Sequence, residues 1–157
     1  MMIKIILNNQ TDFELTKEYE ACFKQCAKEV FAEGEACYEI GLNILNEEEI
    51  RQLNRAYRGV DKSTDVLSFL LEDEDLAQTE GYIYLGDVML CAQKAQQQAM
   101  QYGHGLLREM MYLFVHALLH LKGYDHMTEE EKAQMRAEEE KIMKSMGLER
   151  SQVEDEK

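Results

Sequence analysis

Three of the four histidines in this 157-residue chain, His116, His120 and His126, fall within eleven residues. His116 and His120 are four residues apart, so in a helix both imidazoles project from one face. Gly123 stands where such a helix would end, and a residue that tolerates positive φ there lets the chain turn back and bring His126 to the pair. Three neutral imidazoles with one open position are the ligand set of a catalytic zinc ion. The spacing predicts one Zn²⁺ per chain, held by these three histidines.

The same histidine and glycine spacing occurs in the zinc proteases with the pattern HExxHxxGxxH. Their general base is the glutamate after the first histidine, and Ala117 occupies that position here. Alanine can neither accept a proton nor orient a water molecule. A metallopeptidase-like hydrolase is therefore one alternative, favoured by the histidine spacing and opposed by the absent carboxylate.

The elements that must position these histidines are predicted from hydrophobic periodicity and capping signals. Apolar or alternating segments predict strands over 2–7, 37–45, 65–71 and 82–91. Helices are expected over 11–34, from Asn46, over 92–102, over the apolar segment 106–121 that carries His116, and from Thr128 to near Gly147. Thr11 with Glu14, and Thr128 with Glu131, have the form of capping boxes.

This order of helices and strands predicts an α+β fold, with a mixed sheet of about four strands packed with helices. Its length suits one hydrophobic core. We expect a single metallo-hydrolase domain over 1–147, with a metalloprotease-like metal-binding helix, and a frayed acidic tail over 148–157. No leader pattern is recognised and no apolar run approaches the ~20 residues that span a bilayer, so we expect a cytoplasmic protein with no membrane partner.

The four cysteines fit a reducing compartment, because they form neither a CxxC motif nor a dense disulfide scaffold. Cys22 and Cys26 have a spacing that two metal ligands on one helix face would share, but they belong to an apolar stripe and are interpreted as core residues. His104, between two glycines, is assigned a structural role at a helix junction.

A net charge of −14 argues at first against a nucleic-acid partner, which normally leaves a basic footprint. The charges are unevenly distributed. The segment 72–80 holds five acids and no base, whereas 51–62 holds four bases and one acid. We expect any polyanion to contact the second segment, and the acidic segment 72–80 to be mobile and away from it.

The segment from His116 to His126 resembles the HGxLHLxGYDH signature of the YbeY family, with Ala117 in place of glycine. The segment 53–69 resembles the family's LNxxYRxxDxPTDVLSFP, and 85–88 resembles its LGD strand. The chain has no proline, so Ser63 and Leu70 stand where the family usually has one. Lost prolines change loop rigidity more than chemistry.

The resemblance implies a zinc-dependent endoribonuclease that cleaves single-stranded RNA, acting in 16S rRNA 3′-end maturation and ribosome quality control with ribosomal particles as partners. It assigns the metal ligands to His116, His120 and His126, and the family's functional arginine to Arg58. The other alternative is a non-catalytic ribosome-associated protein that zinc merely stabilises. A fourth protein ligand would indicate such a structural site, whereas an open position would indicate a catalytic one.

An arginine suits phosphoryl chemistry because its planar guanidinium is always charged and holds two phosphate oxygens at once. Arg58 is the candidate for this role, with Arg51 and Arg55 either following the RNA backbone or forming a solvated helix face. Asp125 is interpreted either as a partner that orients a histidine ligand or as part of the next helix cap. Asp87 is open to two interpretations, a buried hydrogen-bond partner or a catalyst.

Overall fold

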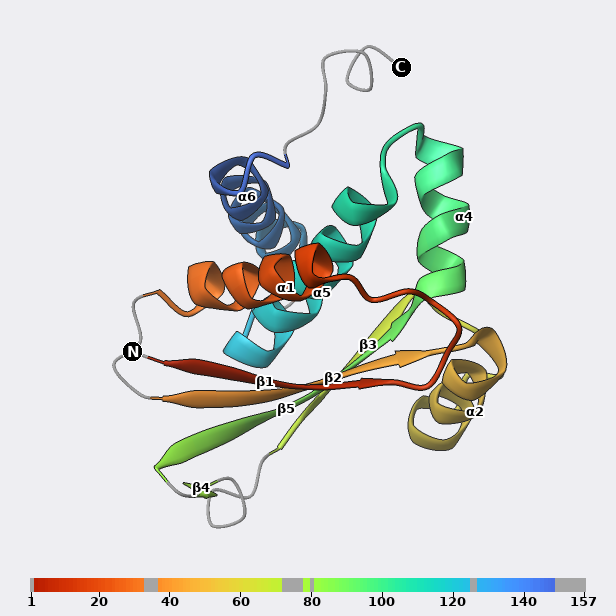
Figure 1. The fold of residues 1–157 in the computed structure, drawn as a ribbon, viewed down its shortest axis with the longest axis horizontal. Helices are drawn as coiled ribbons and strands as arrows, with labels where there is room; N and C mark the ends of the chain where they lie inside the picture. The colour runs from red at the N-terminus through yellow and green to blue at the C-terminus, as the bar shows by residue number, and fades with distance from the viewer. Residues whose placement is uncertain (1, 33–36, 72–77, 80, 125–126, 149–157) are drawn as a thin grey trace.

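The computed structural model describes residues 2–32, 37–71, 78–79, 81–124 and 127–148. Its sheet follows the order β1-β2-β5-β3, with the short β4 paired to the beginning of β5 (Figure 1). β1 and β2 are parallel, as are β2 and β5, whereas β3 runs antiparallel to β5. The strands are β1 (Ile3–Asn9), β2 (Tyr38–Leu45), β3 (Val66–Leu70), β4 (Gln78–Thr79) and β5 (Tyr82–Cys91). The predicted α+β fold with a mixed sheet is confirmed.

Helices cover both faces of this sheet (Figure 1). They are α1 (Lys17–Val30), α2 (Glu47–Arg58), α4 (Ala92–Tyr102), α5 (Leu106–Lys122) and α6 (Glu129–Ser145). Alternate residues of β5 separate the two sides: Val88 and Leu90 belong to the large cluster with α1, α5 and α6, whereas Cys91 belongs to a small cluster with α2. The histidine-bearing helix α5 and the arginine-bearing helix α2 therefore lie on opposite faces of the sheet.

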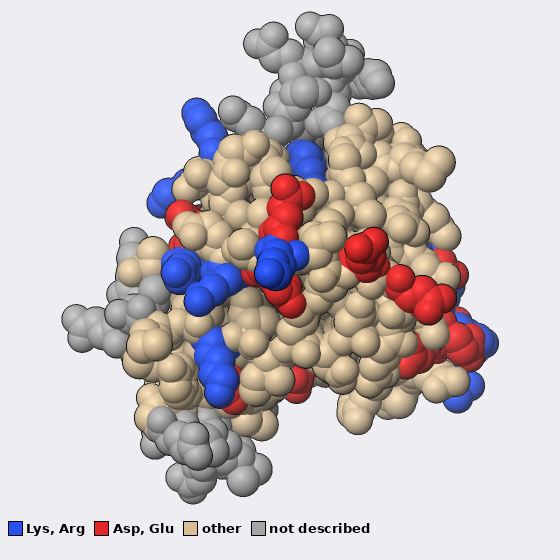
Figure 2. All heavy atoms as spheres, viewed as in Figure 1, with Lys and Arg blue, Asp and Glu red and all other residues tan. Residues whose placement is uncertain are grey.

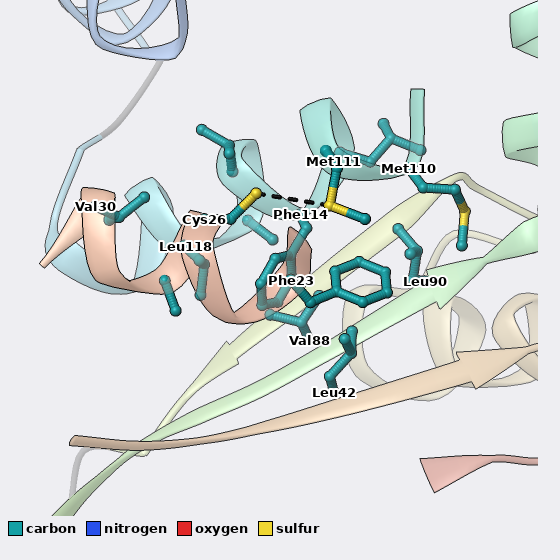
Figure 3. Packing of buried hydrophobic residues seen from close by; sticks show 14 of the residues in the cluster. Phe23, Cys26, Val30, Leu42, Val88, Leu90, Met110, Met111, Phe114 and Leu118 are labelled. Atoms are coloured by element: carbon teal, nitrogen blue, oxygen red, sulfur yellow. Dashed lines mark hydrogen bonds between the residues drawn. The ribbon is translucent and has the colours of Figure 1, made fainter. Parts of the chain in front are cut away.

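The large core forms because α5 is apolar around most of its circumference. Met110, Met111, Phe114 and Leu118 are fully buried between α1 and the sheet (Figure 3). Phe23 of α1 meets Phe114 edge to face, with ring centroids 5.0 Å apart, an arrangement that aromatic pairs favour. The central position predicted for the 106–121 helix is confirmed. Because the core around it is closely packed, the helix is a rigid support for the side chains on its remaining polar face.

The first helix begins later than the sequence pattern predicts. The prediction that Thr11 caps it is wrong: Thr16 is the N-cap, and its hydroxyl accepts a hydrogen bond from the Tyr19 amide. The Thr11 hydroxyl instead donates to Asn9 Oδ1 at 2.7 Å and accepts from the Phe13 amide at 3.1 Å. A local turn therefore uses the side chain that the capping pattern requires. The helix also ends at Val30, short of the predicted residue 34.

The capping box predicted at the last helix is present, and the second helix, predicted to begin at Asn46, has one as well. The Asn46 side chain accepts from the Glu49 amide and the Glu49 carboxylate accepts from the Asn46 amide, and Thr128 and Glu131 form the same pair. Residues 72–77 and 80 of the acidic segment, and residues 149–157 of the predicted tail, lie outside the described residues. No helix among the described residues is long and apolar enough to cross a membrane.

Candidate active site

Helix α5 brings the first two predicted ligands together. The His116 and His120 ring centroids are 4.8 Å apart, with the ring planes nearly perpendicular. The helix ends as predicted at Gly123, whose φ of 115° is one that L side chains rarely adopt. His126 and Asp125 lie outside the described residues, and no group of three or more His, Cys, Asp or Glu side chains suited to a metal ion occurs in the part of the chain that the structure describes.

A buried carboxylate from α6 holds the first of these rings. Glu139 Oε2 lies 2.5 Å from His116 Nδ1, and Glu139 Oε1 accepts a hydrogen bond of 2.9 Å from the Tyr112 hydroxyl. Glu139 is only 3% exposed. Burial, followed by the charge of Glu139, raises the pKa of Tyr112, which keeps the phenol protonated as a donor. Both oxygens of this carboxylate are therefore engaged, and one of them fixes the orientation of His116.

The second ring is held by the backbone just past the helix. His120 Nδ1 lies 3.1 Å from the Tyr124 carbonyl oxygen. A carbonyl oxygen can only accept, so Nδ1 carries the hydrogen, and in the neutral imidazole Nε2 then carries the lone pair. The contact with Glu139 likewise places the hydrogen of His116 on Nδ1 and leaves the lone pair on Nε2. Metal-binding histidines characteristically donate their other ring N–H to a carboxylate or a carbonyl, so the two rings fit a transition-metal ion.

Sequence reasoning missed Glu139, because α6 contains six glutamates and reads as a solvated helix. A signal was nonetheless present. Glu139 follows Met135 by four residues and precedes Ile142 and Met143, which places it within the apolar stripe of the helix. A carboxylate at a core position requires a buried partner, and a histidine is among the few side chains that meet this need.

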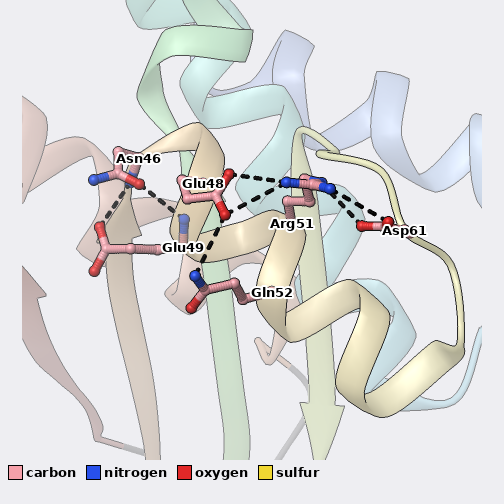
Figure 4. Close-up of polar contacts among 6 residues, drawn as sticks. All are labelled: Asn46, Glu48, Glu49, Arg51, Gln52 and Asp61. Carbon is pink, nitrogen blue, oxygen red and sulfur yellow. Dashed lines mark hydrogen bonds and ion pairs between the residues drawn. The ribbon is translucent and has the colours of Figure 1, made fainter.

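The arginines of α2 differ in how they are held. Arg51 is engaged by two carboxylates: its Nε lies 2.9 Å from Asp61 Oδ1, and a terminal nitrogen lies 3.2 Å from Glu48 Oε2 (Figure 4). That geometry favours the solvated-face interpretation of Arg51. Arg55 and Arg58 are exposed in the last turn of α2. Asn54 donates to the Lys62 carbonyl oxygen at 2.9 Å and so ties the following loop to this turn.

Three other residues singled out from the sequence have structural contacts. His104 Nε2 lies 2.5 Å from Glu109 Oε1, with both side chains 5% exposed, in keeping with a structural role. Asp87 is half-buried and accepts a hydrogen bond from the Tyr84 hydroxyl, as a hydrogen-bond partner would. Cys26 is fully buried beside Met111, and burial raises the pKa of its thiol, so core packing fits it and thiolate ligation does not.

Comparison with known proteins identifies the family. The Endoribonuclease YbeY profile matches residues 5–147. A relative named Endoribonuclease YbeY from Caldanaerobacter subterraneus subsp. tengcongensis is 43% identical over 156 residues, covering 93% of this chain and 98% of the relative. A second of that name from Heliobacterium modesticaldum is 49% identical over 120 residues, covering 71% of this chain and 72% of its own.

A solved structure shares the fold. The solution structure of TM1509 from Thermotoga maritima aligns with a TM-score of 0.56 and 26% sequence identity, covering 96% of this chain and 97% of its own. The family match and the structural match both cover nearly the whole chain. The chain belongs to the YbeY endoribonuclease family.

Proposed function

We propose that this protein is a cytoplasmic, zinc-dependent endoribonuclease that cleaves single-stranded RNA, acting on 16S rRNA during 3′-end maturation and in ribosome quality control. One observation carries the proposal: His116 and His120 lie side by side, each with Nδ1 turned toward a protein acceptor. With His126 they would hold one Zn²⁺ through Nε2. Family membership supplies RNA as the substrate class.

A bound zinc ion lowers the pKa of coordinated water toward ~7 and so supplies a nucleophile at neutral pH. The protein's own residues prepare the site for that chemistry. Glu139 and Tyr112 keep the hydrogen of His116 on Nδ1, and the Tyr124 carbonyl does the same for His120. Arg58 is proposed to hold two non-bridging phosphate oxygens and to stabilise the negative charge that grows there during attack. Because α2 packs on the other face of the sheet from α5, this role requires the Arg58 side chain to reach past the sheet edge toward the histidine side.

The peptidase alternative gains no support at Ala117, the position of the general base in the zinc proteases. Ala117 is 1% exposed and packs in the large core, so the site has no carboxylate where the zinc proteases place their base. The test compares cleavage of a single-stranded RNA, its duplex and a casein substrate, each with chelator and after zinc is restored. RNA cleavage that needs zinc supports the proposal, whereas peptide cleavage, or RNA cleavage unaffected by chelator, contradicts it.

A further inference from the structure

A cavity of about 650 Å³ is lined by residues of the C-terminal end of α4, the first half of α5 and α6. Volumes of this size hold small ligands or single groups of larger ones. Arg108 of α5 and Arg136 and Lys144 of α6 line the cavity, together with Tyr102 and Tyr112. The cavity is therefore a polar recess that combines cations with aromatic rings.

Residues that line the cavity lie on the same face of α5 as the histidine pair. Arg108, Tyr112, His116 and His120 follow one another at intervals of four residues, and all four are half-buried. The other residues of α5 from Glu109 to Leu121 are buried. At 1.5 Å per residue, Arg108 lies about 12 Å along the helix from His116. Tyr112 and Glu139 both line the cavity, and Glu139, which accepts a hydrogen bond from Tyr112, also contacts His116 Nδ1.

Two of the three carboxylates that line the cavity contact a histidine, whereas two of its three cations have no ion pair with another described residue. Glu109 meets His104, and Glu139 meets Tyr112 and His116. The third, Glu140, is exposed. In contrast, Arg136 and Lys144 form no ion pair with another described residue.

Arg108, which also lines the cavity, has no carboxylate partner among the described residues. One of its terminal nitrogens lies 3.2 Å from His104 Nδ1. Its Nε is buried without a hydrogen-bond partner among the described residues, so the guanidinium that lines the cavity keeps one unsatisfied donor.

We propose that this cavity binds one unstacked nucleotide of the single-stranded RNA substrate, with its phosphate on Arg108, Arg136 and Lys144 and its base against Tyr102. The Tyr102 side chain is 50% exposed and offers a ring on which a base stacks. The identity of the ligand as RNA rests on the proposed function. The site gives a chain of net charge −14 a local set of cations beside its histidines.

The test uses two double variants of α6 that change the net charge equally. Arg136→Gln with Lys144→Gln removes two cavity cations, and Lys132→Gln with Lys141→Gln removes two cations of the same helix that do not line the cavity. Binding of a short fluorescein-labelled single-stranded RNA is measured by anisotropy in the presence of chelator. Thermal melting checks that each variant is folded.

The cavity variant should bind roughly tenfold more weakly, and the slope of log affinity against log salt should become shallower by about 1.4, at about 0.7 for each phosphate that is no longer neutralised. The control should change by less than about twofold, because it alters only the long-range field. Tyr102→Leu should weaken RNA binding about fivefold or more, through loss of base stacking, while leaving displacement of the RNA by inorganic tripolyphosphate unchanged.

Equal weakening in both double variants, no weakening in either, or no binding by the unmodified protein overturns the proposal. Cleavage is scored separately with zinc present. If the unmodified protein binds the probe through the cavity but cleaves nothing, the proposed function fails and the binding site stands. If it cleaves RNA while the cavity variant binds as well as the control, the cavity fails and the function stands.

Discussion

The two helices that carry the candidate site residues hold them in opposite ways. On α5, the His116 and His120 rings are half-buried and their Nδ1 atoms lie against Glu139 and the Tyr124 carbonyl. On α2, Arg55 and Arg58 are exposed. α5 packs in the large core, whereas α2 adds only a small cluster on the opposite face of the sheet.

This contrast matches what each group is proposed to do. Metal ligands must converge on one point to within a few tenths of an ångström, and they are placed on a helix whose neighbours fix it. A side chain that meets a flexible single-stranded substrate gains from reach, and an exposed arginine at a helix end has it. On the face shown in Figure 2, Lys and Arg side chains gather on the left half with a few acidic side chains between them, and acidic side chains extend along the right.

The sharpest way to break the comparison is to remove a ring from α5. His120→Ala should abolish RNA cleavage and lose bound zinc, because two histidines and a water bind far more weakly than three histidines. The loss of zinc should also lower the melting temperature, since an ion that binds only the folded state stabilises it. Zinc content by mass spectrometry, with melting curves run with and without chelator, checks this. A variant with full zinc content would show that His120 is not a ligand.

Removing the exposed arginine should separate chemistry from metal binding. Arg58→Ala is expected to lower the cleavage rate by about 10²–10³-fold, the range found when one charge-stabilising group is removed, with zinc content and melting temperature unchanged. Arg58→Lys should restore little, because lysine lacks the planar fork. Arg55→Ala, one turn earlier in α2, is the comparison variant, and the rate at which it cleaves bound RNA should stay unchanged even if a backbone contact is lost. Near-normal cleavage by Arg58→Ala would return the last turn of α2 to a solvated surface.

The carboxylate behind His116 should have a smaller effect, on metal affinity. Glu139→Gln keeps the size of the side chain but removes the charge that fixes His116, and zinc affinity should fall about 10–100-fold. Competition with a chromophoric chelator measures this without any reference to cleavage. Glu138→Gln changes the neighbouring carboxylate of the same helix and should leave the affinity alone. Equal affinities in the two variants would leave Glu139 with a packing role only.

Local patterns in the sequence predicted what short spacings determine. The His116 and His120 pair follows from the helical repeat, and the Asn46 and Thr128 caps follow from a carboxylate three residues further on. The same pattern failed at Thr11, because the Thr11 hydroxyl donates a hydrogen bond to the Asn9 side chain. The helix is instead capped by Thr16. Glu139 could not be paired with His116 from spacing, because the two residues are 23 apart in the chain and come into contact only when α6 folds back on α5.

The mildest change should affect α2 and leave α5 untouched. Asn46→Ala removes the hydrogen bond of 2.8 Å that Asn46 Oδ1 accepts from the Glu49 amide, and the free energy of unfolding should fall by about 1 kcal/mol, as for other N-cap losses. Asn46→Ser keeps an acceptor, so it should lower the free energy of unfolding by only a fraction of that amount. Because α2 and the histidines lie on opposite faces of the sheet, zinc affinity should be the same in both variants. Urea unfolding and chelator competition measure the two quantities. A loss of zinc affinity in Asn46→Ala would mean that the helices are coupled through the sheet, and α2 would then be part of the frame that holds the metal site as well as the carrier of Arg58.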